Sequence, residues 1–145
     1  MANKSILVTG AFDIVHRGHI ELLTRSANLA DKLYIGLTSD ATIRKRKGDG
    51  LPINCYGDRS KLLLSMGCVH CIYPIRGLKH EDIMQSTYDL VDKLKPDLIV
   101  GGFDRSADDF MKPLVDRFSW LTYLIMYHGY EDIHSTDIIK RIRRK

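Results

Sequence analysis

The sequence predicts an α/β domain built on a doubly wound, mostly parallel sheet of five strands. Two observations predict this fold class: short aliphatic runs bounded by Gly or Pro recur five times along the 145 residues, and stretches with helical apolar spacing lie between them. Strands that alternate with helices form β–α–β units with right-handed crossovers. A chain of this length builds a single core without disulfides, so we expect one domain over residues 1–145.

Each predicted strand is a short and continuous apolar run, as is typical of strands that are buried on both faces. In chain order the runs are Ser5 to Thr9, Lys32 to Thr38, Val69 to Pro74, Asp97 to Val100 and Leu121 to Met126.

The predicted helices fall between these strands. After the first strand, one helical face carries Ile20, Leu23, Ala27 and Ala30. Similar patterns predict helices over 58–66, 81–93 and 107–118, and a last helix that begins at residues 135–137, where Ser, Thr and Asp are good N-caps.

One long stretch, Arg44 to Gly57, has no regular pattern, and a loop of that length in a compact domain is usually functional. In a Rossmann-like sheet, ligands bind beyond the carboxyl ends of the strands. The residues that follow each strand are therefore the first functional candidates.

Charge and composition limit the kinds of molecule that the protein is expected to bind. The net charge is +4, but five of the last six residues are basic, so the rest of the chain is close to neutral. Nucleic acid is therefore an unlikely partner of the domain surface, although the basic end could still bind RNA or another polyanion. No apolar run approaches the ~18–20 residues of a membrane span.

The three cysteines predict a reducing, cytoplasmic location, because an odd number in a chain of this length does not suit a disulfide scaffold. The Cys68-Val69-His70-Cys71 segment has no second Cys/His pair at zinc-site spacing. We therefore predict no metal site made of protein side chains.

The strongest chemical signal follows the first strand, over Thr9 to His19. Gly10 permits a tight turn, and the amides there and at the next helix start can bind a phosphate. His16 and His19 beside such a turn could stabilise a transferring phosphoryl group. The simpler interpretation is a turn glycine with a histidine that caps the helix.

This segment resembles a known signature. Gly10-Ala11-Phe12-Asp13 followed by His16-Arg17-Gly18-His19 is similar to the His-x-Gly-His element of the cytidylyltransferase-like nucleotidyltransferases, and Ile133-His134-Ser135-Thr136 resembles their second element. The resemblance implies their nucleotidyltransferase fold.

The middle of the chain resembles one branch of that family. Residues 44–54 and Arg59 look like the loop and following Arg of adenylyltransferases that make ADP-heptose from heptose 1-phosphate. The chain departs from this branch at two places. Leu51 stands where the loop of that branch has Arg, and Gly102-Phe103-Asp104 resembles the Gly-Tyr-Asp of archaeal-type FAD synthetases. Glycerol-3-phosphate cytidylyltransferases and FAD synthetases therefore stay open as alternatives, as does a silent module that binds nucleotide or RNA.

The resemblance implies that an NTP, ATP first and CTP second, gives its NMP group to a phosphorylated small molecule, with Mg²⁺ and release of pyrophosphate. A homodimer is possible by the same analogy. The implied catalytic residues are His16, His19 and Lys47. The nucleotide would also meet Thr9, Gly10, Ala11, Phe12, Gly102, Asp104, Ser135 and Thr136, and the acceptor or triphosphate would meet Asp13, Arg44, Lys47 and Arg59.

Overall fold

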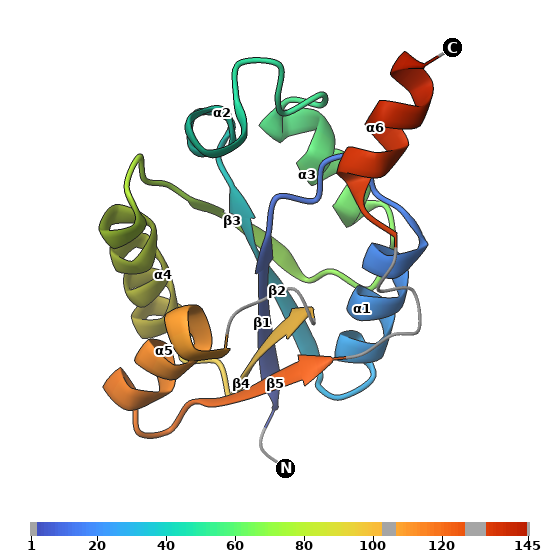
Figure 1. Ribbon diagram of the computed structural model, residues 1–145. Coiled ribbons are helices and arrows are strands. Elements are labelled where there is room, and N and C mark those ends of the chain that lie inside the picture. Colours follow the sequence, from blue (N-terminus) through green and yellow to red (C-terminus); the bar gives the residue numbers. More distant parts are fainter. Residues whose placement is uncertain (1–2, 103–106, 127–132, 145) are drawn as a thin grey trace.

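The computed structural model describes residues 3–102, 107–126 and 133–144, and its sheet has five parallel strands in the order β3-β2-β1-β4-β5 (Figure 1). The strands are β1 (Ser5–Gly10), β2 (Lys32–Thr38), β3 (Cys71–Ile75), β4 (Leu98–Gly102) and β5 (Thr122–Met126). The predicted α/β class is confirmed, and the five strands lie within one or two residues of the predicted bounds.

Helices cover both faces of the sheet. They are α1 (Arg17–Ala27), α2 (Asp40–Lys47), α3 (Tyr56–Leu64), α4 (His80–Leu94), α5 (Lys112–Arg117), preceded by the π-helical turn η1 (Ala107–Met111), and α6 (Ser135–Arg143). Within the described residues, no helix is both long enough and apolar enough to cross a membrane.

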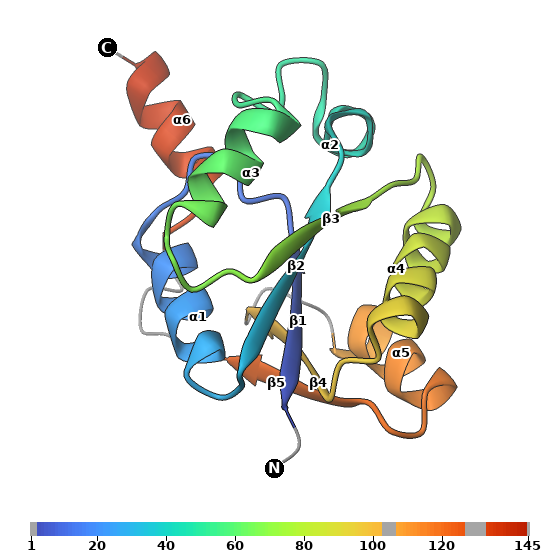
Figure 2. The same cartoon turned by 180° about the vertical axis from the view of Figure 1, so that it is seen from behind.

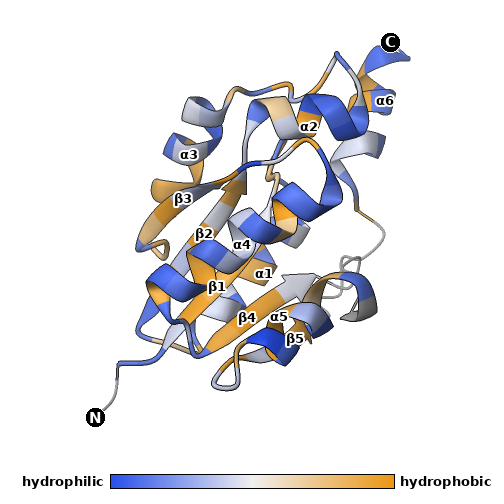
Figure 3. Cartoon of the chain, turned by 90° about the vertical axis from the view of Figure 1, so that its left-hand side faces the viewer, coloured by the Kyte–Doolittle hydropathy of each residue, from blue (hydrophilic) through white to orange (hydrophobic). Residues whose placement is uncertain are grey.

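Two apolar clusters form the core, one on each face of the sheet. Leu22 and Leu23 of α1 and Leu63 of α3 pack on one face, while Val91 of α4 and Leu114 of α5 pack on the other (Figures 1 and 2). The hydrophobic colour of the strands against the hydrophilic outer sides of the helices shows the same layering (Figure 3). Burial of both sheet faces explains why the strands are continuous apolar runs.

The expectation of an irregular stretch over 44–57 is wrong at both ends, because residues 40–47 form α2 and residues 56–57 begin α3. Ser39 caps this helix: its Oγ accepts a hydrogen bond from the amide of Thr42 at 3.3 Å. The helix is held by the cap and by one buried apolar side chain, Ile43, rather than by an apolar stripe. The remaining irregular segment is residues 48–55, which contains a cis Leu51–Pro52 peptide bond.

The strand order indicates which edge of the sheet is expected to bind a ligand. The chain winds outward from β1 in one direction to β2 and β3, and in the other to β4 and β5, so the switch point lies between β1 and β4. At this carboxyl edge lie the turn after β1, α2 and the first turn of α6, far from the N-terminus (Figure 1).

Candidate active site

A cavity of about 280 Å³ opens at the switch point of the sheet. Its lining comes from six parts of the chain: the turn after β1, α1, the end of β2, α2 with Leu51 four residues beyond it, the end of β4, and the first half of α6. Among the predicted site residues, the lining contains Thr9, Gly10, Ala11, Phe12, Asp13, His19, Lys47, Gly102, Ser135 and Thr136.

The turn after β1 has an unusual backbone. Phe12 and Ile14 both have φ of 48°, in the left-handed region that side chains rarely adopt. A Cβ at position 10 would lie only 2.8 Å from the Phe12 ring, so a larger residue there would displace the ring. The buried Phe12 ring then packs at 5.2 Å from the His19 ring. The turn thus sets the position of one of the two histidines.

The two histidines form a stacked pair at the start of α1. Their ring centroids lie 3.9 Å apart with an interplanar angle of 28°. Nδ1 of His16 accepts a hydrogen bond from the Gly18 amide at 3.2 Å, and Nδ1 of His19 accepts one from the His16 amide at 3.3 Å. Because Nδ1 is the acceptor in both rings, each neutral imidazole carries its proton on Nε2 and can donate it toward an anion.

This arrangement joins the two interpretations of His16. It caps α1 through Nδ1, as the simpler interpretation proposes, and it also stacks on His19, which lines the cavity. His16 itself lies beside the cavity lining rather than in it.

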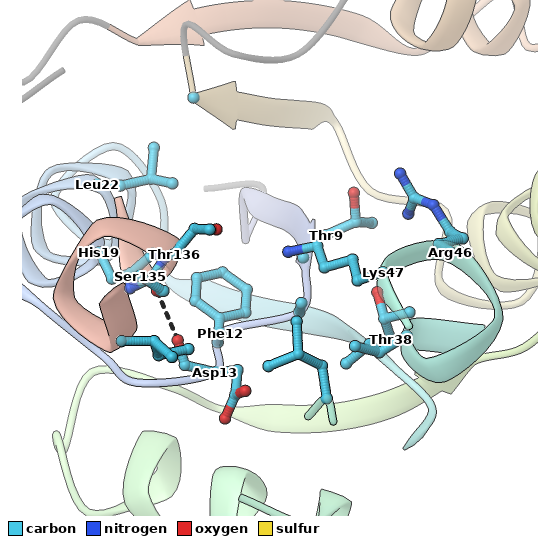
Figure 4. A pocket seen from close by; sticks show the side chains of 16 residues that line it. Thr9, Phe12, Asp13, His19, Leu22, Thr38, Arg46, Lys47, Ser135 and Thr136 are labelled. Carbon is cyan, nitrogen blue, oxygen red and sulfur yellow. Dashed lines mark hydrogen bonds between the residues drawn. The ribbon is translucent and has the colours of Figure 1, made fainter. Parts of the chain in front are cut away.

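Two cations reach the cavity from the last turn of α2. They are Lys47, which was expected there, and Arg46, which sequence reasoning did not select. Both lie on the helical face of the buried Ile43, three and four residues earlier. In Figure 4, Phe12 lies in the middle of the site. Arg46 and Lys47 lie on one side of it, and the other side carries His19, Ser135 and Thr136.

Arg44 differs from its expected place. It is exposed and borders a shallow surface depression with Lys45, Asp49 and Leu78, outside the cavity. Its helical position points it away from the face that Ile43 buries, so the structure brings Arg46 to the cavity in its place.

Asp13 lines the cavity, but its carboxylate also holds the segment that follows α2. Oδ2 accepts from the Ile53 amide at 2.6 Å and Oδ1 from the Asn54 amide at 2.9 Å. The side chain is buried, with 7% of its surface exposed. Its geometry therefore indicates a structural anchor of residues 48–55, a role that the sequence did not predict.

Arg59 was expected to hold a substrate phosphate, and the structure corrects this. The residue is 1% exposed, and its guanidinium donates to protein oxygens rather than into the cavity. The signal was present in the sequence, because Arg59 lies four residues before the buried Leu63 on the inner face of α3.

The start of α6 closes the site. The Ser135 hydroxyl donates to the carbonyl oxygens of Asp13 at 2.6 Å and Ile14 at 3.1 Å. These bonds join residues more than 120 positions apart, so the two signature segments meet at one cavity (Figure 4). Thr136 and Ile139 add to the lining.

Several contributors were absent from the sequence-based set: Leu22, Thr38, Ile43, Arg46, Leu51 and Ile139. Thr38 follows the general rule for strand ends. Of the others, Leu51 lies in the irregular segment 48–55, and the rest depend on helix phase and on α6 folding back to β1. Asp104, expected near the nucleotide base or ribose, lies outside the described residues. Within the described ranges, no group of three or more His, Cys, Asp or Glu side chains could hold a metal ion.

The fold and this site define a class: an α/β protein with a cavity at the switch point of a parallel sheet, lined by the turn after β1, one histidine of a stacked pair and two cations. Residues 7–141 match the Cytidylyltransferase-like family model, and the chain belongs to that family.

The most similar sequences include proteins named as bifunctional. The chain is 33% identical to the bifunctional protein HldE of Campylobacter concisus, over 97% of this chain and 27% of the relative. It is 38% identical to a D-beta-D-heptose 1-phosphate adenylyltransferase of Bordetella bronchiseptica, over 71% of this chain and 60% of the relative. The chain thus spans about a quarter of the length of the bifunctional relatives that it matches.

Solved structures agree on the fold. A lipopolysaccharide core biosynthesis protein from Thermoplasma volcanium superposes with a TM-score of 0.67 at 26% identity, covering 87% of this chain and 99% of that one. A bifunctional NMN adenylyltransferase/ADP ribose pyrophosphatase from Francisella tularensis has a TM-score of 0.64 at 15% identity, covering 99% and 42%, and supports the fold alone.

Proposed function

We propose that this chain is an adenylyltransferase that transfers the AMP group of ATP to a sugar 1-phosphate, heptose 1-phosphate first, and releases pyrophosphate. The observation that carries the proposal is the meeting of the two signature segments at one cavity, tied by the Ser135 to Asp13 hydrogen bond and faced by Arg46 and Lys47. The name of the relative at 38% identity, D-beta-D-heptose 1-phosphate adenylyltransferase, supports adenylyl transfer to a heptose phosphate.

The proposed chemistry needs no covalent enzyme intermediate. A phosphate oxygen of the acceptor attacks the α-phosphorus of ATP and forms a new P–O bond, while the bond from the α-phosphorus to the bridging oxygen breaks and its electron pair leaves with pyrophosphate. Holding both phosphates in line supplies much of the rate, because it turns a two-molecule encounter into a positioned one.

Each part of the site has a role in this proposal. The amides after β1 and the start of α6 bind phosphate oxygens. His16 and His19 stabilise the charge that builds on the α-phosphate, through their Nε2 protons. Lys47 and Arg46 bind the β- and γ-phosphates and favour the departure of pyrophosphate.

Mg²⁺ fits this site as part of the substrate. The one carboxylate in the described lining is Asp13, and both its oxygens already accept amide hydrogens. Mg²⁺ commonly binds phosphates and waters with few protein ligands. We therefore propose that it arrives as Mg·ATP, where it neutralises phosphate charge.

Two further proposals concern the location and the oligomeric state of the protein. A cytoplasmic location is supported by the three free thiols, and a homodimer is proposed by family analogy.

The test is a pyrophosphate-release assay that crosses ATP, CTP, GTP and UTP with heptose 1-phosphate, glycerol 3-phosphate and FMN in Mg²⁺. We expect the highest kcat/KM for ATP with heptose 1-phosphate. The matched control is heptose without its 1-phosphate, which lacks the attacking oxygen and should release none. CTP with glycerol 3-phosphate as the best pair would replace the proposed substrates. ATP binding without turnover in any combination would indicate a silent nucleotide-binding module.

A further inference from the structure

The guanidinium of Arg59 connects several backbone segments from inside the protein. Nε donates to the carbonyl of Asn54 at 3.1 Å, Nη1 to that of Ala11 at 2.5 Å, and Nη2 to that of Thr38 at 2.9 Å. Nη2 also pairs with Oδ1 of Asp40 at 2.7 Å. The arginine side chain is fully buried, which is rare for this residue type unless every donor has a use.

The four acceptors lie on three segments that contribute residues to the cavity lining. Ala11 belongs to the turn that carries the amides and precedes the histidines. Thr38 and Asp40 flank the start of α2, whose last turn carries Lys47. Asn54 lies in the segment that Asp13 also holds. One side chain therefore fixes the distance between the histidine side of the cavity and its cationic side.

Asp40 extends this connection. Its second oxygen, Oδ2, accepts from the Tyr56 amide at 3.1 Å, so the first turns of α2 and α3 share one carboxylate. Burial raises the pKa of the Tyr56 phenol, whose ring lies 5.7 Å from the Arg59 guanidinium. Tyr56 is therefore neutral near pH 7, and Asp40 supplies the negative charge that pairs with the buried arginine.

We propose that Arg59 is a positioning residue for nucleotidyl transfer: it touches no substrate, and it sets where Lys47 stands relative to the turn after β1. This proposal rests on the proposed function. A lysine at position 59 would keep the charge, but its single ammonium group cannot reach acceptors on three sides as a planar guanidinium does. Arg59→Lys should therefore leave the fold in place and let α2 drift relative to the turn.

The test is a double-mutant cycle between Arg59→Lys and Lys47→Ala, read as kcat/KM for ATP. Residues that act independently have additive effects. If Arg59 positions Lys47, then Lys47→Ala should lower kcat/KM about 100-fold in the wild-type background and less than about 5-fold in the Arg59→Lys background. Because both routes of the cycle end at the same double variant, Arg59→Lys alone should cost at least about 20-fold. A purely structural arginine would lower the melting temperature and leave the effect of Lys47→Ala the same in both backgrounds.

The matched control is Arg25→Lys, which makes the same chemical change at an exposed pair with Glu21 and should leave both rate and cycle unchanged. The dissociation constant of Mg·ATP, measured by calorimetry, is the second readout. If wild-type protein binds ATP without turnover, the proposed function fails and the cycle is judged on binding.

Equal effects of Lys47→Ala in both backgrounds, or wild-type kcat/KM in folded Arg59→Lys, would overturn the positioning role. If Arg59→Lys does not fold, Asp40→Asn replaces it in the same cycle, because it weakens the ion pair and retains an oxygen that can accept from Nη2. The same two criteria then apply.

Discussion

His16 contributes to this protein through both nitrogens of its ring. Nδ1 accepts a hydrogen bond from the Gly18 amide and so caps α1, while the proton on Nε2 can be donated toward an anion. Asparagine can take over the first contribution, since it is a good N-cap, and it has no imidazole for the second.

Comparing His16→Asn with His16→Ala separates these contributions. Both variants should lose about 10²–10³-fold in kcat, the usual cost of removing one donor to developing charge. His16→Ala should also lose about 1 kcal/mol of unfolding free energy through the missing cap, and His16→Asn little. Steady-state kinetics and urea unfolding measure the two effects. Full kcat in the Asn variant would remove His16 from the catalytic group.

Asp13→Ala should act mainly on stability. Its removal takes a charged acceptor from two part-buried hydrogen bonds, those of the Ile53 and Asn54 amides, at a cost of about 1–3 kcal/mol for each bond. The matched control is Asp31→Ala, where an exposed carboxylate accepts the Lys4 amide and water can replace it, so the loss should stay below about 1 kcal/mol. Equal losses in chemical unfolding would contradict the anchoring role of Asp13.

The helix α2 shows how element geometry selects functional side chains. Its last four residues are all basic, and only their helical phase relative to the buried Ile43 decides which ones face the cavity. Arg46 and Lys47 share that face, and Arg44 lies outside the cavity.

Arg46→Ala and Arg44→Ala form a matched pair, because they make the same change two positions apart in α2. Arg46→Ala should raise the KM for ATP about 10-fold, as expected for the loss of a charge-assisted contact to phosphate. Arg44→Ala should change it less than about 2-fold, because an exposed charge is screened by solvent. Initial rates at varied ATP measure both. The reverse order would mean that α2 presents another face to the nucleotide.

The sequence predicted the buried elements well and the polar ones poorly, for one reason. Strands such as 32–38 are continuous apolar runs, and their burial leaves a direct pattern in the sequence. The α2 helix carries only one buried aliphatic side chain, so its pattern resembles a charged loop. Arg59 was assigned to substrate for a related reason: charge type suggests phosphate, and only the surrounding carbonyls show that its partners are internal.

Across the whole molecule, the site depends on contacts distant in sequence. The sheet brings the ends of β1, β2 and β4 to one edge, and α6 returns from the far end of the chain to bond the turn after β1 through Ser135. Patterns in the sequence predict the strands and the helices other than α2, while the pairing of Asp13 with residues 53 and 54 appears only in the folded chain.

A ligand that bridges these segments should stabilise all of them together. Mg·ATP at 100 times its dissociation constant adds about 2.7 kcal/mol to the unfolding free energy, which corresponds to a rise of about 5–10 °C in Tm for a domain of this size. Differential scanning calorimetry measures the rise, and Lys47→Ala at the same ATP concentration should reduce it because the affinity falls. Hydrogen exchange should slow at the turn after β1, in α2 and at the start of α6 in parallel, since one ligand contacts all three. Protection confined to α2 would mean that ATP binds its basic residues alone, as an exposed charge cluster would, and that the cavity at the switch point is not the nucleotide site.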